Sequence, residues 1–169
     1  YNIGFNLSTI HNEMLKADPN QVLYGSAWKG SGHFVTQTLK GYPVASFWLY
    51  QTNGIFQSDT EAAAYVNSKG ERLQPDAEAG DIRFIDTNGD GSIDANDKVY
   101  SGSGIPKVEA NLSFSGSYKN FDLSFQLGSA WGHKLYNVNR LYYEGMDAGR
   151  NYFRSTLNAW TPQNTGSDI

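Results

Sequence analysis

Oxygen-bearing side chains recur at alternate positions in residues 86–97, which read DTNGDGSIDAND. Counted from Asp86, they fall at positions 1, 3, 5, 9 and 12, with glycine at position 6. A hard divalent cation takes six or more oxygens at about 2.3 to 2.6 Å, which alternate residues of a tightly wound loop can supply. The spacing predicts a structural calcium site, with Ser92 contributing its backbone carbonyl. The predicted ligands are Asp86, Asn88, Asp90, Ser92, Asp94 and Asp97.

Two features separate this loop from an EF-hand. Position 12 is Asp97, whose arm is shorter than that of the usual bidentate glutamate, so calcium would bind more weakly or magnesium would be favoured. Residues 80–85 read GDIRFI, which is typical of a strand and not of a flanking helix. The alternative is a solvated turn without metal, because Asn-Gly and Asp-Gly are common turn formers. Oxygen-bearing side chains at five of the ligand positions of a calcium loop favour the metal site.

Composition favours a β-rich chain. The 169 residues are 39% hydrophobic and 14% aromatic and include 18 glycines. The net charge is −4 without a cluster of lysine or arginine, which argues against nucleic-acid binding. Cysteine is absent, which excludes disulfides and thiol catalysis. There is no run of about 18 apolar residues, so no transmembrane helix is predicted.

No motif points to an enzyme. The chain contains neither a Gly-x-Ser-x-Gly elbow nor a Gly-Lys-Ser/Thr phosphate loop. His11, His33 and His133 are scattered, and no motif selects a pair of carboxylates for glycoside hydrolysis. We therefore predict no catalytic residue and no cofactor-binding residue other than the metal ligands.

Three segments alternate apolar and polar residues. Residues 1–8 do so without interruption, so the sequence opens inside a strand and we expect it to be part of a longer polypeptide. Residues 107–118 and 121–131 continue the pattern on either side of Lys119 and Asn120. Strands of about 10 to 12 residues are long enough to cross a bilayer at a tilt.

A soluble hairpin with one face on a core would show the same alternation. The lengths of the connections favour the membrane. Roughly 95 residues separate the opening strand from Lys107, which is far longer than loops in compact soluble domains. Short turns at one end and long loops at the other are typical of outer-membrane barrels. Tyr118 and Phe121 flank the short turn, where an interfacial aromatic girdle would lie.

Other elements are predicted outside these strands. The capping-box sequence at 58–61 predicts a helix from Asp59 to about Asn67, and a second short helix is expected over 151–160, before Pro162. Short strands are expected within 21–24 and 33–39. For five aromatic residues we favour packing in an aromatic girdle or in the core of a loop over stacking on sugar rings. These are Trp28, Trp48, Tyr50, Trp131 and Tyr136.

Six stretches, taken in order, resemble the C-terminal part of the SusC/RagA family of TonB-dependent outer-membrane transporters. The calcium-type loop alone is shared with other modules, whereas the ordered set is specific and covers most of the chain. The stretches are GYPVASF at 41–47, NGIFQ at 53–57, GDIRF at 80–84 running into DTNGDG at 86–91, IPK at 105–107, YKNFDLS at 118–124 and WTPQN at 160–164.

The resemblance implies a mainly β fold of antiparallel strands from a 22-stranded transmembrane β-barrel, with long extracellular loops and one or two short helices. Residues 1–10 would be a strand, 11–106 an extracellular segment with the metal loop, 107–131 a transmembrane-type hairpin and 132–169 an extracellular loop. Such barrels lie in the outer membrane of Gram-negative bacteria. They import glycans or peptides with energy from TonB, under a SusD-like surface lipoprotein.

In this chain, TonB would act only through parts of the receptor that the sequence does not contain. The implied partners are the SusD-like lipoprotein, an oligosaccharide or peptide substrate and outer-membrane lipid, without nucleic acid. The competing hypothesis is a soluble, secreted carbohydrate-binding or adhesion module stabilised by calcium. Solubility without detergent would distinguish the two.

Overall fold

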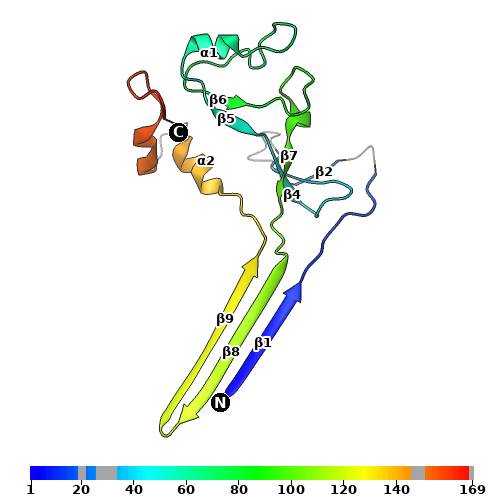
Figure 1. The fold of residues 1–169 in the computed structure, drawn as a ribbon, viewed down its shortest axis with the longest axis vertical. Helices are drawn as coiled ribbons and strands as arrows, with labels where there is room; N and C mark the ends of the chain where they lie inside the picture. Colours follow the sequence, from blue (N-terminus) through cyan, green and yellow to red (C-terminus); the bar gives the residue numbers. More distant parts are fainter. Residues whose placement is uncertain (19–21, 26–33, 146–150, 168–169) are drawn as a thin grey trace. The chain divides into compact units, whose positions relative to one another are not determined.

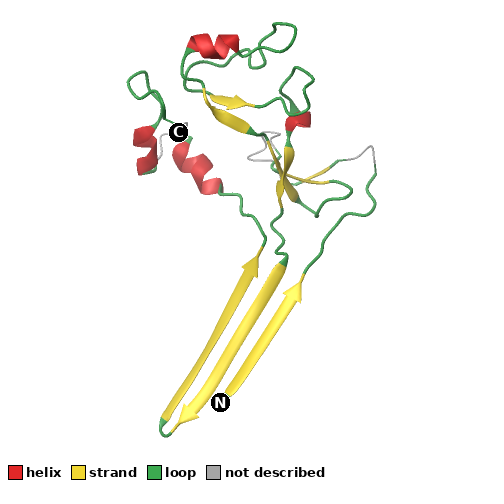
Figure 2. Ribbon diagram, in the orientation of Figure 1, coloured by secondary structure: helices red, strands yellow, loops and turns green. Residues whose placement is uncertain are grey.

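The computed structural model describes residues 1–18, 22–25, 34–145 and 151–167. The chain divides into two compact units, one made of residues 1–48 and 100–135 and the other of 49–99 and 136–169. Figures 1 and 2 show the elements, which are mainly strands. In chain order they are β1 (Asn2–Thr9), β2 (Leu23–Tyr24), β3 (Thr36–Thr38), β4 (Ser46–Leu49), β5 (Thr52–Ile55), α1 (Asp59–Ala64), β6 (Ile82–Phe84), the 3₁₀ turn η2 (Ala95–Asp97), β7 (Val99–Gly102), β8 (Val108–Tyr118), β9 (Phe121–Trp131), α2 (Val138–Glu144) and the 3₁₀ turn η3 (Arg154–Asn158).

The first unit is built on a three-stranded antiparallel sheet of order β1-β8-β9 (Figure 1). The opening strand pairs with β8 from Asn2 opposite Ser115 to Thr9 opposite Val108, although about 100 residues separate the two strands in sequence. β8 and β9 form a hairpin in unbroken register from Tyr118 opposite Phe121 to Val108 opposite Trp131. The predicted strands and their antiparallel pairing are therefore present.

One face of this sheet is apolar on all three strands. The register sets Phe5 beside Leu112 and Leu112 beside Leu127, and the rings of Phe114 and Phe125 stack across the hairpin at 5.3 Å. These side chains are not covered, because Phe5 is 68% and Leu127 59% exposed. The opposite face is polar. It carries Asn2, Asn6, Glu109, Asn111, Ser113, Asp122, Ser124 and Gln126.

The two ends of the sheet differ in their connections. At one end β8 and β9 are joined by two residues, Lys119 and Asn120, and Lys119 has a positive φ of 55°. At the other end Thr9, Val108 and Trp131 lie side by side, and both long segments of the chain leave there. The predicted asymmetry between a short turn and long excursions is thus confirmed.

A smaller sheet of order β2-β3-β4-β7 follows in the same unit. Three of its neighbouring rings form a cluster, in which the Tyr42 ring lies 4.8 Å from that of Trp48 and 5.1 Å from that of Tyr100. The indole N–H of Trp48 donates to the Ser46 hydroxyl at 3.0 Å. Trp48 thus packs within a cluster, as the packing interpretation expects. Gln21, Trp28 and His33, which also entered the sequence predictions, lie outside the described residues.

The second unit has a small core around Phe56. Phe56 is fully buried, and Ile55 and Ala62 are buried apolar residues of the same unit. The Tyr65 ring lies 5.7 Å from that of Phe56, and the Tyr65 hydroxyl donates to the Phe84 carbonyl at 2.7 Å. β5 and β6 pair antiparallel in this unit, so the strand predicted at 80–85 is present as β6. The core is small because much of the unit is loop.

Helix α1 begins where the capping box predicts. The Ser58 hydroxyl accepts the backbone N–H of Glu61, and the Glu61 carboxylate accepts that of Gln57 at 2.8 Å. The helix ends at Ala64, three residues earlier than predicted. The Asn67 side chain accepts the backbone N–H groups of Lys69 and Glu71, which closes a turn in place of further helix.

The C-terminal segment contains two short helical elements. The predicted helix at 151–160 is present as the 3₁₀ turn η3, whereas α2 was not predicted. Trp160 anchors this segment within the second unit. Its indole N–H donates to the Gln57 amide oxygen at 3.1 Å, and the same oxygen accepts the backbone N–H of Gly166 at 2.7 Å.

Gly80→Ala should destabilise this unit, because Gly80 lies under Trp160. A Cβ there would be 2.7 Å from the indole Cε3, at a φ of 95°. Gly70→Ala is the matched control, since Gly70 has a φ of 82° and open space around it. We expect Gly80→Ala to lose about 1 to 3 kcal/mol more than the control in denaturant unfolding. Equal losses would mean that the Trp160 contact does not constrain this position.

No helix among the described residues combines the length and apolar character needed to cross a bilayer.

Candidate functional site

The predicted metal loop lies between β6 and β7 and is wound by its own side chains. The Asp86 carboxylate accepts the backbone N–H groups of Gly89 at 2.7 Å and Gly91 at 2.8 Å. Asn88 accepts the N–H of Asp90 at 2.8 Å, and Asp90 accepts that of Ser92 at 2.9 Å. Gly89 and Gly91 have φ angles of 74° and 90°, a conformation that glycine adopts without steric cost. The loop therefore curls around its first three acidic or amide side chains.

Asp97 has a different environment. It is fully buried, and its carboxylate accepts the backbone N–H of Thr87 at 2.8 Å, that of Asn88 at 3.4 Å and that of Asp94 at 2.7 Å. Burial raises the pKa of this carboxyl, but these hydrogen bonds and that of the Thr87 hydroxyl outweigh burial, so its pKa lies below the ordinary value. In this structure Asp97 closes the loop by joining its two ends.

Asp94 is exposed at the start of η2. Its carboxylate accepts the backbone N–H of Asn96 at 2.7 Å, while Asp97 reciprocates on the backbone of Asp94, which forms a capping box. Asp94 therefore has a local capping role in addition to its predicted role as a ligand.

Asn67 is a contributor that sequence reasoning missed. It lies outside the loop, and its amide donates to the Gly91 carbonyl at 3.0 Å. A Cβ on Gly91 would lie 3.2 Å from the Asn67 amide nitrogen, so the two residues are tightly packed. No local sequence signal reveals this contact, because it joins residues 24 positions apart.

The six predicted ligands are only partly brought together. The Asn88 amide donates to the Asp90 carboxylate at 2.9 Å, and both lie near the amides that Asp86 accepts. Within the described part of the chain, no three His, Asp or Glu side chains form a group that could hold a metal ion. Asp86, Asp90 and Asp94 would have to draw closer to coordinate one. The types of oxygen fit a hard cation, since the carboxylate oxygens of Asp86, Asp90 and Asp94 have lone pairs beyond those used here.

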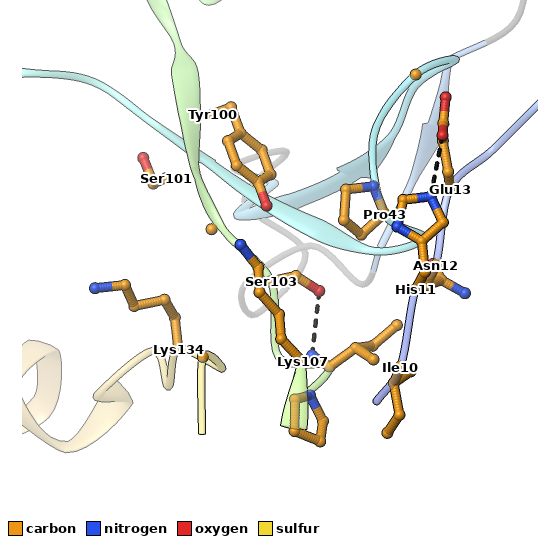
Figure 3. A pocket seen from close by; sticks show the side chains of 15 residues that line it. Ile10, His11, Asn12, Glu13, Pro43, Tyr100, Ser101, Ser103, Lys107 and Lys134 are labelled. Atoms are coloured by element: carbon orange, nitrogen blue, oxygen red, sulfur yellow. Dashed lines mark hydrogen bonds and ion pairs between the residues drawn. The ribbon is translucent and has the colours of Figure 1, made fainter. Parts of the chain in front are cut away.

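A cleft of about 630 Å³ lies at the end of the long sheet where the loops depart (Figure 3). Its walls come from residues 10–13, 41–43, 100–107 and 132–134, all in the first unit, and we call it the loop-end cleft. The sheet ladder continues into it, because Ile10 N–H donates to the Lys107 carbonyl at 2.9 Å and Lys107 N–H to that of Trp131 at 2.8 Å. No sequence pattern predicted this cleft.

Three curated proteins are similar to this chain. TonB-dependent receptor P3 of Formosa agariphila is 28% identical over the whole chain, and TonB-dependent receptor P26 of the same organism is 30% identical over 83% of it. TonB-dependent receptor SusC of Bacteroides thetaiotaomicron is 24% identical over 80% of the chain. The homologues of this chain are TonB-dependent receptors. No family model matches it.

These receptors are far longer than this chain, which spans 12 to 16% of their length. The resemblance inferred from the six sequence stretches is confirmed by them. TonB-dependent receptors are transporters of the outer membrane of Gram-negative bacteria, and the predicted localisation is confirmed. The mainly β, antiparallel architecture agrees with such a receptor.

Proposed function

We propose that this chain is a membrane-spanning portion of an outer-membrane, SusC-like importer, in which β1, β8 and β9 are neighbouring strands of a 22-stranded barrel. The observation that supports this most is the uncovered apolar face that runs the full length of all three strands. The 11 residues of β9, from Phe121 to Trp131, span about 33 Å and at a 40° tilt about 25 Å, the height of the lipid-facing band of such barrels.

The edges of the sheet support the same proposal. Among the described residues, β1 and β9 each pair only with β8, which leaves 8 and 11 residues with a free row of backbone groups. Long, exposed edges next to an apolar face would aggregate in water. In a closed barrel both edges are paired by further strands, and no backbone polar group meets lipid.

The direction of the strands follows from their connections. In outer-membrane barrels the short turns are periplasmic and the long loops extracellular. Accordingly, Lys119 and Asn120 would face the periplasm, while residues 11–106 and the segment after Trp131 would lie outside the cell. A SusD-like lipoprotein would cover that outer side, TonB would supply energy through other parts of the receptor, and the cargo would be an oligosaccharide or a peptide.

The metal loop has a place in this proposal. A divalent cation, calcium or magnesium, would bind Asp86, Asn88, Asp90, the Ser92 carbonyl and Asp94, and Asp97 would join only by giving up amide hydrogen bonds. The ion would add binding energy to the ordered loop alone. Such stabilisation matters in this segment because its apolar core around Phe56 is small. Its role is structural.

Calcium should therefore stabilise the chain. At an ion concentration 100 times the dissociation constant the gain is about 2.7 kcal/mol in the free energy of unfolding. Asp86→Ala combined with Asp90→Ala should abolish the gain, whereas Asp76→Ala, an exposed acid outside the loop, should retain it. Thermal unfolding with calcium or with chelator measures the difference. If chelator leaves the wild-type curve unchanged, the loop does not bind the ion.

Solubility tests the importer against a soluble calcium-stabilised module. We expect the purified chain to need detergent, because Phe5, Leu123 and Leu127 are more than half exposed on one face. Analytical ultracentrifugation should find aggregates in buffer and small particles in detergent. A monomer in plain buffer with a sharp thermal transition would favour the soluble module.

A further inference from the structure

The loop-end cleft is lined by two lysines that have no ion-pair partner among the described residues. Lys107 and Lys134 both line it, and neither forms an ion pair with any residue that the structure describes. The carboxylate in the cleft, that of Glu13, lies 3.3 Å from the His11 imidazole. With two lysines and one carboxylate, the lining carries an excess of positive charge.

Each lysine stem rests on a glycine of a neighbouring segment. A Cβ on Gly132 would lie 3.0 Å from Cβ and 3.1 Å from Cγ of Lys107, and a Cβ on Gly102 would lie 2.6 Å from Cγ of Lys134. Both glycines have positive φ, 80° and 115°. The two lysine stems thus occupy the space that a side chain at Gly132 or Gly102 would need. This packing limits the directions that the two ammonium groups can take.

The backbone below the lysines is fixed as well. Lys134 N–H donates to the Ser103 carbonyl at 2.7 Å, and Lys107 is bonded on both sides to the extended ladder of the long sheet. Ser103 is 7% exposed, and its hydroxyl accepts the N–H of Ile105 at 3.1 Å. The backbone that carries these two exposed lysines is therefore held by hydrogen bonds.

An aromatic ring faces the same cleft. Tyr100 lines it, is 39% exposed, and is held by the rings of Tyr42 and Trp48 at 5.1 and 6.0 Å. Figure 3 shows the Lys107 side chain rising on the side where Tyr100 lies. A rigid ring with a polar tip packs well against the C–H face of a sugar, and the volume suits a ligand of a few rings.

We infer that the loop-end cleft binds an oligosaccharide that carries anionic substituents, with Tyr100 against a sugar face and Lys107 and Lys134 each on a separate carboxylate or sulfate. This inference rests on the proposed importer function and narrows its cargo to acidic glycans. Charge-assisted hydrogen bonds from ammonium to anion supply the selectivity over neutral sugars.

The test uses the chain in detergent micelles and matched ligands by isothermal titration calorimetry. Oligogalacturonate and a sulfated galactan oligosaccharide are the two acidic probes, and fully methyl-esterified oligogalacturonate is the neutral form of the first. We expect at least one acidic probe to bind at least about tenfold more tightly than the neutral ester, with affinity that falls as salt rises. Whichever acidic probe binds identifies the anionic group.

Variants locate the binding. Lys107→Gln with Lys134→Gln should weaken the acidic probe about tenfold or more, and the two Lys→Arg replacements should retain binding. Lys119→Gln is the matched control, because Lys119 lies in the turn at the opposite end of the sheet. Near-UV circular dichroism must match the wild type for every variant.

Three results would overturn the inference: equal binding of the ester, no effect of the double variant, or tighter binding of pentaglutamate, which would assign the cleft to an acidic peptide. If these binding experiments fail while the strands are still found to face lipid, the acidic-glycan inference is wrong and the importer proposal stands.

Discussion

Leu112→Arg is expected to destabilise the chain in lipid by about 2 to 4 kcal/mol, the cost of a cation at the midplane of the lipid face of a barrel. Leu112 lies near the middle of β8, between Phe5 on β1 and Leu127 on β9. An arginine there has no aqueous side to reach, because its neighbours on that face are all apolar. Denaturant unfolding in phospholipid vesicles measures the loss.

Asn111→Arg provides the control on the same strand. Asn111 is one residue away and belongs to the polar face, so its replacement should change the unfolding free energy by no more than about 0.5 kcal/mol. The contrast between adjacent positions separates a lipid-facing surface from a general intolerance of charge. Similar losses at both positions would count against a membrane-facing side.

Asp97→Ala should also have a large effect, about 3 kcal/mol or more. The fully buried carboxylate accepts the backbone N–H groups of Thr87 and Asp94 at 2.8 and 2.7 Å, and its removal leaves both without a partner. Each buried, unsatisfied donor costs about 1 to 3 kcal/mol. Chemical denaturation without calcium isolates this structural role from any effect on ion binding.

Asp94→Ala is the comparison for Asp97→Ala, because Asp94 is exposed and caps a single 3₁₀ turn, worth about 1 kcal/mol. The pH dependence gives a second check. Since the pKa of Asp97 is lower when folded, its stabilisation is present above the unfolded pKa and is lost as pH falls through the folded pKa. The gap between wild type and Asp97→Ala should therefore close in acid. A gap that is constant with pH would contradict this role.

The long strands could be predicted because their information is local. Period-two alternation fixes which residues share a face, and the two-residue turn fixes the register of β8 with β9. The pairing of β1 with β8 has no local sequence signal, because about 100 residues separate the two strands. The capping box likewise located the start of α1 at Asp59, whereas its end depended on the side chain of Asn67.

The candidate sites were less predictable. Spacing alone assigned the same role to all six loop residues, but burial separates Asp97 from the exposed Asp90 and Asp94, and burial depends on how Thr87 folds back. The loop-end cleft depends on four segments meeting, and its lysines rest on glycines across strands. Helix α2 was missed because it lacks a side-chain cap that would signal its start.

The central claim is that the apolar face of β1, β8 and β9 meets lipid. Because the chain has no cysteine, single cysteines can be placed along β9 and spin-labelled in vesicles. Electron paramagnetic resonance should find labels at Phe121, Leu123, Phe125 and Leu127 accessible to oxygen, and labels at Asp122, Ser124 and Gln126 accessible to a water-soluble nickel chelate. If accessibility does not alternate, or the odd-numbered positions are shielded from both reagents, the strands do not face lipid.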